Sequence, residues 1–453
     1  MATVVVVQPA DATSTSGDYS GDRGRCVVLD PETHPEGVEP GDLVLQTPPF
    51  AKLLHPDLWS SQCHHCFAPA AKLSRCGRCR TAYYCSRACQ QKDWKPDHHV
   101  ECRQLEQIVS LRLQSTQVSD MLLLGRVMRR LNAGQSAGSA EQGVLPTDLV
   151  WNEADFCQET LLLATLAQKL KLIDESYSSR ELQMMLSRFA NNNFSICDDL
   201  LLEIGAGCFP LGAMVNNSCD PNCAITFTAT AHTMEFRAMR RVVPEEEITQ
   251  SYVDIALPRH ERQRRLESKY HFRCKCPRCI APMEDPQSLD ANLDADINGI
   301  PESQWNEYRM KEFETAAALL TNPMVAGKNN DEKRATLLRA LEIQQRILHP
   351  EHISILQTCS TLFSAEMEDG RMDEAILYGE RMLEFYRRVY PANHPLTGLH
   401  LFTLGDLHLQ QQETQGNPRR AKEYLEEAKR ILQITHGRAH HFVELLSQRI
   451  QAC

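Results

Sequence analysis

Eight residues that can bind a metal through sulfur or nitrogen stand in four closely spaced pairs near the N-terminal end of the chain. A Cys-x2-Cys pair places two thiolates on one tight turn, where both reach one zinc ion at about 2.3 Å. Eight such ligands suit two zinc ions with tetrahedral coordination. The repeated spacing argues against free thiols or a redox role. The pairs are Cys63-x2-Cys66, Cys76-x2-Cys79, Cys85-x3-Cys89 and His98-x3-Cys102.

The histidine of the fourth pair has an alternative, because His98 and His99 are adjacent in the sequence. Residues four positions apart lie on one face of an α-helix. His98 and Cys102 have this spacing, so we expect His98 rather than His99 to be the ligand.

A second cysteine cluster lies in the segment YHFRCKCPRC, where Cys274, Cys276 and Cys279 are close together. Three thiolates leave one tetrahedral position open, so a fourth ligand must come from elsewhere in the chain. The candidates are Cys219, Cys208 and Cys223, or a water at a catalytic zinc. No HExxH or deaminase pattern accompanies the cluster, which favours a structural site.

Composition and charge limit the classes of function. The chain has 453 residues, of which 42% are hydrophobic and 24% charged, so it is expected to form two or three globular domains. Its net charge of −11 argues against a general nucleic-acid binder. Residues 63–102 carry seven Lys/Arg and three Asp/Glu. Seven thiolates and two Zn²⁺ contribute −3, so the metal-loaded segment would carry only about +1 and suits DNA phosphates poorly.

The role expected of the cysteines depends on the cellular compartment. No apolar run approaches the ~18 residues of a membrane span. The run of four valines near the start has no preceding Lys or Arg and is too short for a secretory signal. We therefore expect the chain in the cytoplasm and the nucleus. In these reducing compartments, 18 cysteines are better explained by metal binding than by disulfides.

Hydrophobic periodicity and turn residues divide the rest of the chain into predicted segments. Residues 1–20 are predicted to be a flexible leader. The other predictions are a strand ended by prolines over 41–50, helical structure over 105–131, a small-residue loop over 133–143, a buried helix over 156–172, short strands over 191–252 and helices from about 303 onward.

The helical tail contains a repeat. His352, His394 and His440 are 42 and 46 residues apart, and Ala375 and Ala421 occupy corresponding positions 46 apart. Each unit is predicted to be a helix, a turn and a second helix. This resembles tetratricopeptide-type stacking with a period longer than the usual ~34 residues. A plain helical bundle is the alternative, and in either case the tail would serve as an interaction or lid surface.

Three segments, RGRCVVL, MVNNSCDPNC and EEEITQSYVDI, resemble the SET methyltransferase domain, and YHFRCKCPRC resembles its post-SET zinc site. The block 63–102, which includes YYCSRACQQKDW, resembles a MYND finger. Their order resembles that of the SET-and-MYND (SMYD) lysine methyltransferases, over roughly residues 20–285, and the tail fits that family's C-terminal domain.

This resemblance implies an α+β fold, in which a MYND finger splits a SET-type core of short strands, followed by a post-SET zinc site and an all-α tetratricopeptide-like domain. The implied boundaries are a leader over 1–20, the N-terminal part of SET over 21–62, the MYND finger over 63–102, a helical insertion over 103–190, the SET core over 191–258, the post-SET segment over 259–285 and the helical domain over 286–453.

The family pattern also assigns the metal ligands to three structural zinc sites. In MYND fingers the pairs interleave, and in the post-SET site the cysteine of NxSCxPN supplies the fourth ligand, which makes Cys219 the preferred candidate. The implied sets are Cys63, Cys66, Cys85 and Cys89; Cys76, Cys79, His98 and Cys102; and Cys219, Cys274, Cys276 and Cys279.

The resemblance further implies S-adenosylmethionine as cofactor and direct methyl transfer to a deprotonated lysine. Tyr252 would orient the amine and the methyl group, and Tyr270 would form the aromatic wall of the lysine channel. Such a channel lowers the pKa of a lysine by desolvation and accepts the methylated cation through cation–π attraction. The implied cofactor contacts are Arg23, Gly24, Arg25, Asn192, Asn216, Asn217, Tyr252 and Phe272.

Two positions depart from the family pattern. Asn217 stands where the family usually has a histidine, and Cys26 stands where it often has a glycine. If position 26 required a positive φ, Cys26 would be strained there.

The expected function is therefore protein-lysine N-methylation, with lysines of histone tails or other proteins as substrates. The alternative is a catalytically silent adaptor, whose finger and tail bind partner peptides. The remaining expectations are proline-containing peptides as partners of the finger, no sequence-specific nucleic acid, no membrane, and a monomer.

Overall fold

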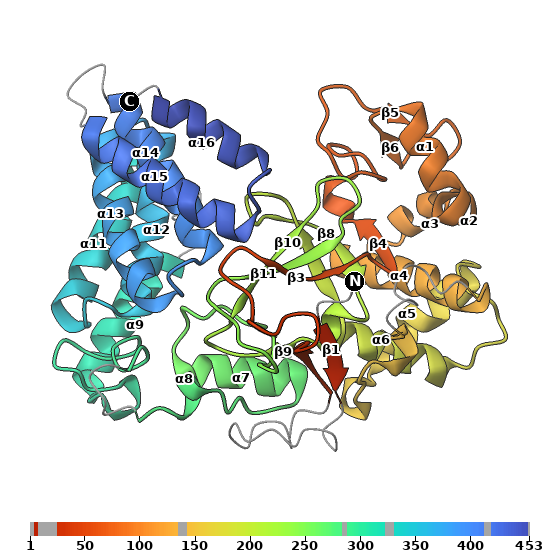
Figure 1. Ribbon diagram of the computed structural model, residues 1–453, viewed down its shortest axis with the longest axis horizontal. Helices are drawn as coiled ribbons and strands as arrows, with labels where there is room; N and C mark the ends of the chain where they lie inside the picture. The colour runs from red at the N-terminus through yellow and green to blue at the C-terminus, as the bar shows by residue number, and fades with distance from the viewer. Residues whose placement is uncertain are drawn as a thin grey trace.

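In the computed structural model of this protein, strands gather at the centre, between helices on either side (Figure 1). The finger and helices α4–α6 (between residues 115 and 192) lie on the right of the view, and the C-terminal helices α9–α16 (between residues 307 and 451) lie on the left. The structure describes residues 4–7, 25–134, 143–282, 288–321, 330–411 and 418–451. Within these residues, no helix combines the length and the apolar character that crossing a membrane requires.

Strands from both sides of the finger pair in the central core. One sheet has the order β10-β11-β3 and another has the order β4-β8-β7, while β9 and β12 form a short parallel pair. The chain therefore leaves the core after β4 and returns at β7, which confirms a strand core split by an insertion. The strands are β3 (Leu43–Thr47), β4 (Ala51–Leu54), β7 (Phe194–Cys197), β8 (Glu203–Cys208), β9 (Asn216–Asn217), β10 (Cys223–Phe227), β11 (Met234–Ala238) and β12 (Thr249–Gln250).

The period-2 pattern of β11 fixes which side faces the core. Met234, Phe236 and Ala238 are fully buried, whereas the residues between them are half-buried. Phe236 pairs with Ile225 of β10 and with Leu45 of β3. A shift of one residue would turn these apolar side chains to the opposite face, so the alternation sets the register.

The first valines are part of this fold. Strand β1 (Val4–Val7) pairs antiparallel with β2 (Cys26–Leu29), with Val4 opposite Leu29. The prediction of a flexible leader is therefore wrong at these four residues, whose β-branched side chains favour a strand; residues 8–20 lie outside the described residues. Cys26 is in an extended strand and is not among the described residues with positive φ, so the expected strain at this position is not present.

The finger and the helical insertion follow β4. The predicted helical stretch over 105–131 is two helices, because the chain turns between them at Arg112, which has a φ of 53°. The helix predicted over 156–172 is amphipathic rather than buried, since Leu161 and Leu162 are 43% and 50% exposed. The loop predicted over 133–143 lies mostly outside the described residues. The elements are β5 (Ser74–Arg75), β6 (Tyr83–Tyr84), α1 (Arg87–Asp93), η2 (Trp94–His98), α2 (His99–Glu101), α3 (Gln104–Ser110), α4 (Ser115–Asn132), α5 (Gln158–Lys169) and α6 (Ser179–Asn192).

The C-terminal part is helical, as predicted, and consecutive helices pack on one another. Helix α14 approaches α15 closely at Gly405, where an added Cβ would lie 2.5 Å from the side chain of Leu425. Helix α15 also packs against β11, which joins the helical domain to the strand core. The helices from the post-SET segment onward are α7 (Arg259–Tyr270), α8 (Pro277–Ile280), α9 (Glu307–Thr321), α11 (Asn330–Ile347), α12 (Ile353–Glu368), α13 (Met372–Val389), α14 (Pro395–Gln410), α15 (Pro418–Thr435) and α16 (His441–Gln451).

The three repeated histidines have one structural role, which is to cap helices. The Nδ1 atom of His352 accepts a hydrogen bond from the backbone N–H of Ser354 at 3.1 Å, at the start of α12. His394 does the same for Leu396 at 3.3 Å, at the start of α14. His440 does so for Phe442 at 3.3 Å, beside the start of α16. Each repeat unit therefore begins with a histidine that satisfies a free N–H of the first turn.

These caps predict a pH dependence of stability. Burial lowers the pKa of His352 and of His394 to about 4, and Nδ1 accepts a hydrogen bond only when it carries no proton. The unfolded chain, with a histidine pKa of about 6.5, binds more protons between pH 6.5 and 4. The stabilisation is thus complete above pH 6.5 and is lost as the pH falls toward 4, by at most about 1.4 kcal/mol per pH unit for each histidine.

The measurement is the free energy of unfolding in urea at pH 6.5 and at pH 5.5, for the parent and for His352→Asn/His394→Asn. Asparagine is a good N-cap that does not titrate. We expect the double variant to lose about 2 kcal/mol less than the parent over this interval. If the parent and the double variant lose the same free energy of unfolding, His352 and His394 do not act as neutral helix caps.

Candidate functional site

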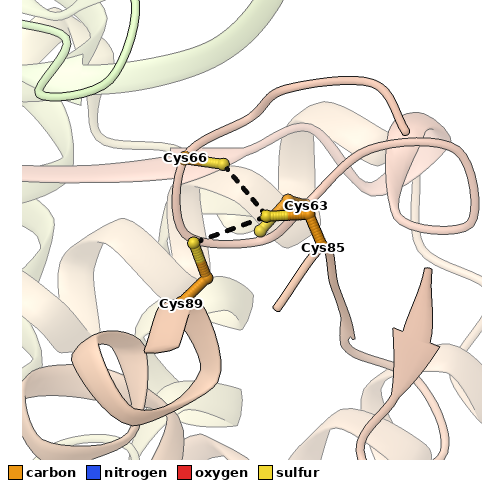
Figure 2. A group of neighbouring side chains, drawn as sticks. All are labelled: Cys63, Cys66, Cys85 and Cys89. Atoms are coloured by element: carbon orange, nitrogen blue, oxygen red, sulfur yellow. Dashed lines mark hydrogen bonds between the residues drawn. The ribbon is translucent and has the colours of Figure 1, made fainter. Parts of the chain in front are cut away.

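The first predicted zinc set converges in the finger. Figure 2 shows the side chains of Cys63, Cys66, Cys85 and Cys89 turned toward one another, and their sulfur atoms all lie within 4.8 Å of one another. The Sγ atoms of Cys66 and Cys85 are 3.7 Å apart, and those of Cys85 and Cys89 are 3.5 Å apart. Four thiolates at about 2.3 Å from a tetrahedral zinc would be separated by about 3.8 Å. The donor set therefore fits zinc.

The second set also converges within the finger, and all four of its side chains are buried. The Sγ atoms of Cys76 and Cys102 are 3.8 Å apart, and Sγ of Cys79 is 3.7 Å from Nε2 of His98. His99 points elsewhere, with its Nδ1 3.0 Å from the backbone oxygen of Trp94. His98 ends the π-helical turn η2, and such a turn takes up one more residue than an α-helical turn. Eight residues separate Cys89 from His98, and the wider turn takes up one of them.

The third set joins Cys219 to Cys274, Cys276 and Cys279, and all four side chains are buried. The Sγ atoms of Cys219 and Cys279 are 3.5 Å apart. The alternative ligands lie in strands, Cys208 in β8 and Cys223 in β10, and neither belongs to the cluster. Burial raises the pKa of both thiols, that of Cys208 to about 12, so they are neutral core residues. The three clusters fit three zinc ions.

A buried ionic network surrounds the third set, and the sequence analysis did not identify it. Asp290 receives hydrogen bonds from Arg262 at 2.7 Å and from Arg278 at 2.8 Å, and both Arg262 and Asp290 are 0% exposed. Arg262 also donates to Sγ of Cys279 at 3.7 Å, and Arg278 donates to the backbone oxygen of Cys219 at 3.2 Å. Burial alone would raise the pKa of Asp290, but the hydrogen bond from Arg262 and the charge of Arg278 lower it. The two guanidinium groups offset the negative charge of the thiolates.

A second network attaches the finger to the helical insertion. Asp97 and Glu101 alternate with the ligands His98 and Cys102 along the chain. The carboxylate of Glu101 accepts hydrogen bonds from Arg126 of α4 at 2.8 and 3.0 Å. Burial would raise the pKa of Glu101, but the charges of Arg126 and Arg129 lower it to about 2. The segment that carries two zinc ligands is therefore fixed to α4. The other pairs in this network are Arg129 with Glu101 at 2.7 Å and Arg130 with Asp97 at 2.7 Å.

The two tyrosines predicted to be catalytic lie together beside the third cluster. The ring centroids of Tyr252 and Tyr270 are 4.9 Å apart, and Phe272 meets Tyr252 edge-on at 6.3 Å. The hydroxyl of Tyr252 donates to the backbone oxygen of Val215 at 2.9 Å. Both tyrosines line a cavity of about 330 Å³. Its other walls are Asn191, Asn192, Asn193, Phe194, Ser195, Cys197, Leu201, Ala213, Ile225, Phe227, Gln250, Ser251 and Lys269.

Asn217 connects the cavity to the metal cluster. Its Nδ2 donates to Sγ of Cys274 at 3.4 Å, and its Oδ1 accepts from the backbone N–H of Tyr252 at 2.8 Å. Asn217 is 2% exposed, so both bonds are shielded from water. An asparagine has a donor and an acceptor on one side chain, which this double contact requires.

The structure brings part of the predicted cofactor set together. Nδ2 of Asn216 donates to the backbone oxygen of Arg25 at 3.2 Å. Asn192 lines the cavity, and its Nδ2 donates to the backbone oxygen of Val150 at 2.9 Å. Phe272 lies beside Tyr252, as described above. Arg23 and Gly24 lie outside the described residues.

A buried acceptor without a partner, next to Asn192, shows what kind of ligand these residues suit. Oδ1 of Asn193 is buried and makes no hydrogen bond within the part of the chain that the structure describes. Such an atom is costly unless a ligand or water pairs with it. Asn193 also lines the cavity, so the residues present fit a ligand that carries an amine or hydroxyl. Asn193 was not among the residues predicted from the sequence, although it follows the predicted contact Asn192 in the run NNNF.

Comparison with known proteins agrees with this arrangement. Family models match the MYND finger at residues 63–102, the SET domain at 85–253 and a tetratricopeptide repeat at 364–396. The structure adds β3 and β4 to the core, although both precede the SET match. These matches confirm the predicted order of finger, SET core and tetratricopeptide-like tail.

Curated relatives extend over nearly the whole chain. Histone-lysine N-methyltransferase SMYD3 of Homo sapiens is 29% identical over 92% of this chain and 93% of that protein. Histone-lysine N-methyltransferase ASHR1 of Arabidopsis thaliana is 26% identical over 91% and 90%. N-lysine methyltransferase SMYD2-A of Danio rerio is 26% identical over 91% and 93%.

The ionic network around the third cluster predicts the effect of Asp290→Asn. This substitution removes the carboxylate that pairs with the buried Arg262 and Arg278, which should destabilise the fold by roughly 3 kcal/mol. Metal analysis of the parent should find three zinc ions per chain. In the variant, one of the three should pass to a colorimetric chelator about tenfold faster or more.

Asp294→Asn is the matched control, because Asp294 pairs with His260, whose side chain is 60% exposed. We expect its zinc release to match that of the parent. Unchanged release in Asp290→Asn would show that the network does not support the metal site, and two zinc ions in the parent would remove the third cluster as a zinc site.

Proposed function

Because this chain belongs to the SET-and-MYND family of protein-lysine methyltransferases, we propose that its aromatic cavity is the place where a substrate lysine is methylated. The observation that carries this proposal is the enclosure of Tyr252. It packs against Tyr270 and Phe272, and Asn217 holds its backbone against the thiolate cluster. A hydroxyl fixed in this way can orient an amine.

The cofactor residues are proposed from the family pattern and from their positions. S-adenosylmethionine would be held by Arg25, Asn192, Asn216, Asn217, Tyr252 and Phe272, together with Arg23 and Gly24. When bound, S-adenosylmethionine supplies an electrophilic methyl group on a sulfonium. The orphan acceptor of Asn193 supports a ligand with a donor group at this end of the cavity.

The cavity would prepare the substrate amine for reaction. A lysine amine has a pKa of about 10.4, so it must lose a proton before it can attack. Aromatic and aliphatic walls disfavour the charged form by desolvation. Lys269 also lines the cavity, with its Nζ 5.0 Å from the ring centroid of Tyr270. A second positive charge there would lower the pKa of the substrate amine further.

Tyr252 would then position the neutral amine. Its hydroxyl and the backbone oxygen of Val215 are 2.9 Å apart and offer two oxygen atoms to the N–H groups of the amine. Two acceptors fix the direction of the nitrogen lone pair, which is the main requirement for an in-line transfer. After transfer, Tyr252 and Tyr270 suit the methylated ammonium through cation–π attraction, worth roughly 0.5–2 kcal/mol.

The substrates are proteins, and we propose histone tails or other basic segments among them. Two of the relatives described above are named histone-lysine methyltransferases and one is named an N-lysine methyltransferase. The net charge of −11 favours positively charged partners. For the finger we propose proline-containing peptides and no sequence-specific nucleic acid. We also propose a monomer that acts in the cytoplasm and the nucleus.

The adaptor alternative would be favoured if the two departures from the family pattern disturbed the cofactor site. Cys26 lies in a strand without positive φ, and Asn217 makes two hydrogen bonds that support Tyr252. Neither substitution therefore gives a reason for a silent site. Calorimetric titration of the protein with S-adenosylmethionine separates the two functions, since an adaptor would show no binding.

The central prediction concerns Tyr252→Phe. Removing the hydroxyl should lower kcat for methyl transfer about tenfold to hundredfold, because the amine loses its orientation. Affinity for S-adenosylmethionine should change little, because the variant keeps the aromatic ring through which Tyr252 would contact the cofactor. The measurement is mass spectrometry of histones and of a lysine-peptide array after incubation with the enzyme and cofactor.

Tyr308→Phe serves as the control, because Tyr308 is 70% exposed on α9. Its activity should equal that of the parent. If Tyr252→Phe methylates as fast as the parent, the role given to Tyr252 is wrong.

A further inference from the structure

Three side chains from two distant parts of the chain converge outside the thiolate clusters. Asp199 lies in the turn between β7 and β8, while His440 and His441 lie at the start of α16. Oδ1 of Asp199 is 3.1 Å from Nε2 of His440, and its Oδ2 is 3.7 Å from Nδ1 of His441. One ligand atom from each residue lies within 4.8 Å of the other two.

The distances match what a metal ion would impose. Nitrogen and oxygen ligands bind zinc at about 2.0–2.1 Å, which separates neighbouring ligands of a tetrahedral site by about 3.3 Å. The two measured separations lie on either side of this value. Two imidazoles and one carboxylate are a common donor set for borderline divalent cations, and three protein ligands leave one position for water.

The local structure holds these groups toward one another. Asp198 fixes the turn, because its Oδ1 accepts from the backbone N–H of Leu200 at 3.0 Å and of Leu202 at 2.8 Å. His440 directs Nε2 at Asp199, since its Nδ1 faces the backbone N–H of Phe442. All three residues line a cavity of about 940 Å³ between the strand core and α15, so an ion can reach them.

His436 is a second, independent indication of a ligand. It is 8% exposed, lines the same cavity, and its ring centroid is 5.0 Å from that of His440. Thr435 Oγ1 is 3.2 Å from the backbone oxygen of Ile431 and 2.8 Å from Nδ1 of His436, so Nδ1 of His436 has a hydrogen-bond partner. Nε2 of His436 is buried and makes no hydrogen bond within the described ranges.

Besides Asp199, the charged groups on the wall of this cavity are Asp42, Asp198, Glu235, Arg237, Arg430 and Arg438.

We propose that Asp199, His440 and His441 form a binding site for a divalent zinc ion, separate from the three cysteine clusters. The ion would tie the turn between β7 and β8 to the start of α16, and so join the SET core to the C-terminal domain. This site does not depend on methyl transfer.

Metal binding at this site should break one hydrogen bond of the protein, which gives the proposal a local consequence that can be measured. An imidazole that binds a metal through Nε2 carries its proton on Nδ1. Metal binding by His440 therefore removes the capping bond to Phe442, which at 3.3 Å is already long. The first turn of α16 should loosen locally as the ion binds, whereas the junction between the two domains becomes more stable.

The test is a titration of the full chain, with its three zinc ions in place, with Zn²⁺ and with Co²⁺. We expect a saturable fourth equivalent. Bound Co²⁺ should give d–d absorption without thiolate charge-transfer bands, which distinguishes this site from exchange into a cysteine cluster. The melting temperature should rise with Zn²⁺.

Asp199→Asn and His441→Ala should each weaken binding of the fourth ion about tenfold or more. The His441 side chain is 60% exposed, so alanine should not disturb folding, and circular dichroism checks this. His260→Ala is the matched control, because His260 pairs with Asp294 at 3.0 Å and is in no described group of metal-binding side chains. It should bind as the parent does.

The proposal is overturned if no fourth equivalent binds, or if both variants bind it with the affinity of the parent. A fourth ion that binds only as a bridge between two chains, detected by sedimentation, would also overturn it. Asp199 and His440 would then be a hydrogen-bonded pair without a metal.

Discussion

The convergence of Cys219 with Cys274, Cys276 and Cys279 is the constraint on which the aromatic cavity depends. Cys219 belongs to the turn after β9, and the other three belong to the segment after α7. Joining them fixes Tyr270 and Phe272, just before the cysteines, against Tyr252. Asn217 extends this constraint from a thiolate to the backbone of Tyr252 itself. The metal is therefore structural, and it acts on the chemistry only through the position of the tyrosines.

Buried arginines make such a cluster tolerable in the interior. Four thiolates around Zn²⁺ leave a charge of −2, and a buried charge is unfavourable unless it is compensated. Arg259, Arg262 and Arg278 all pair with Asp290, and the four side chains together carry +2, which compensates that charge. In the finger, the buried pair of Arg126 with Glu101 instead attaches the segment that carries His98 and Cys102 to α4 of the helical insertion. The post-SET segment is attached to the SET core by the hydrogen bond from Arg278 to the backbone oxygen of Cys219.

Short-range patterns were enough to predict much of this molecule. The pairs of cysteines are close in sequence because each pair occupies one turn, so their spacing revealed the two finger sites. The motif around Cys219 and Tyr252 indicated the SET core, and the alternation in β11 reflects one buried face. The repeat of His352, His394 and His440 was visible as a period, although its meaning was not. Only the geometry identified these histidines as helix caps.

What the sequence did not reveal depends on contacts between distant residues. Asp290 and Arg262 carry no local signal, because an aspartate and an arginine in a polar sequence most often face water. Asp199 and His440 are separated by 241 residues and meet only because α15 packs on β11. The four valines were misjudged for the same reason, since their partner strand begins at Cys26. A short apolar run forms a strand only when a second strand is available to pair with it. The residues of the run alone do not show whether such a partner strand exists.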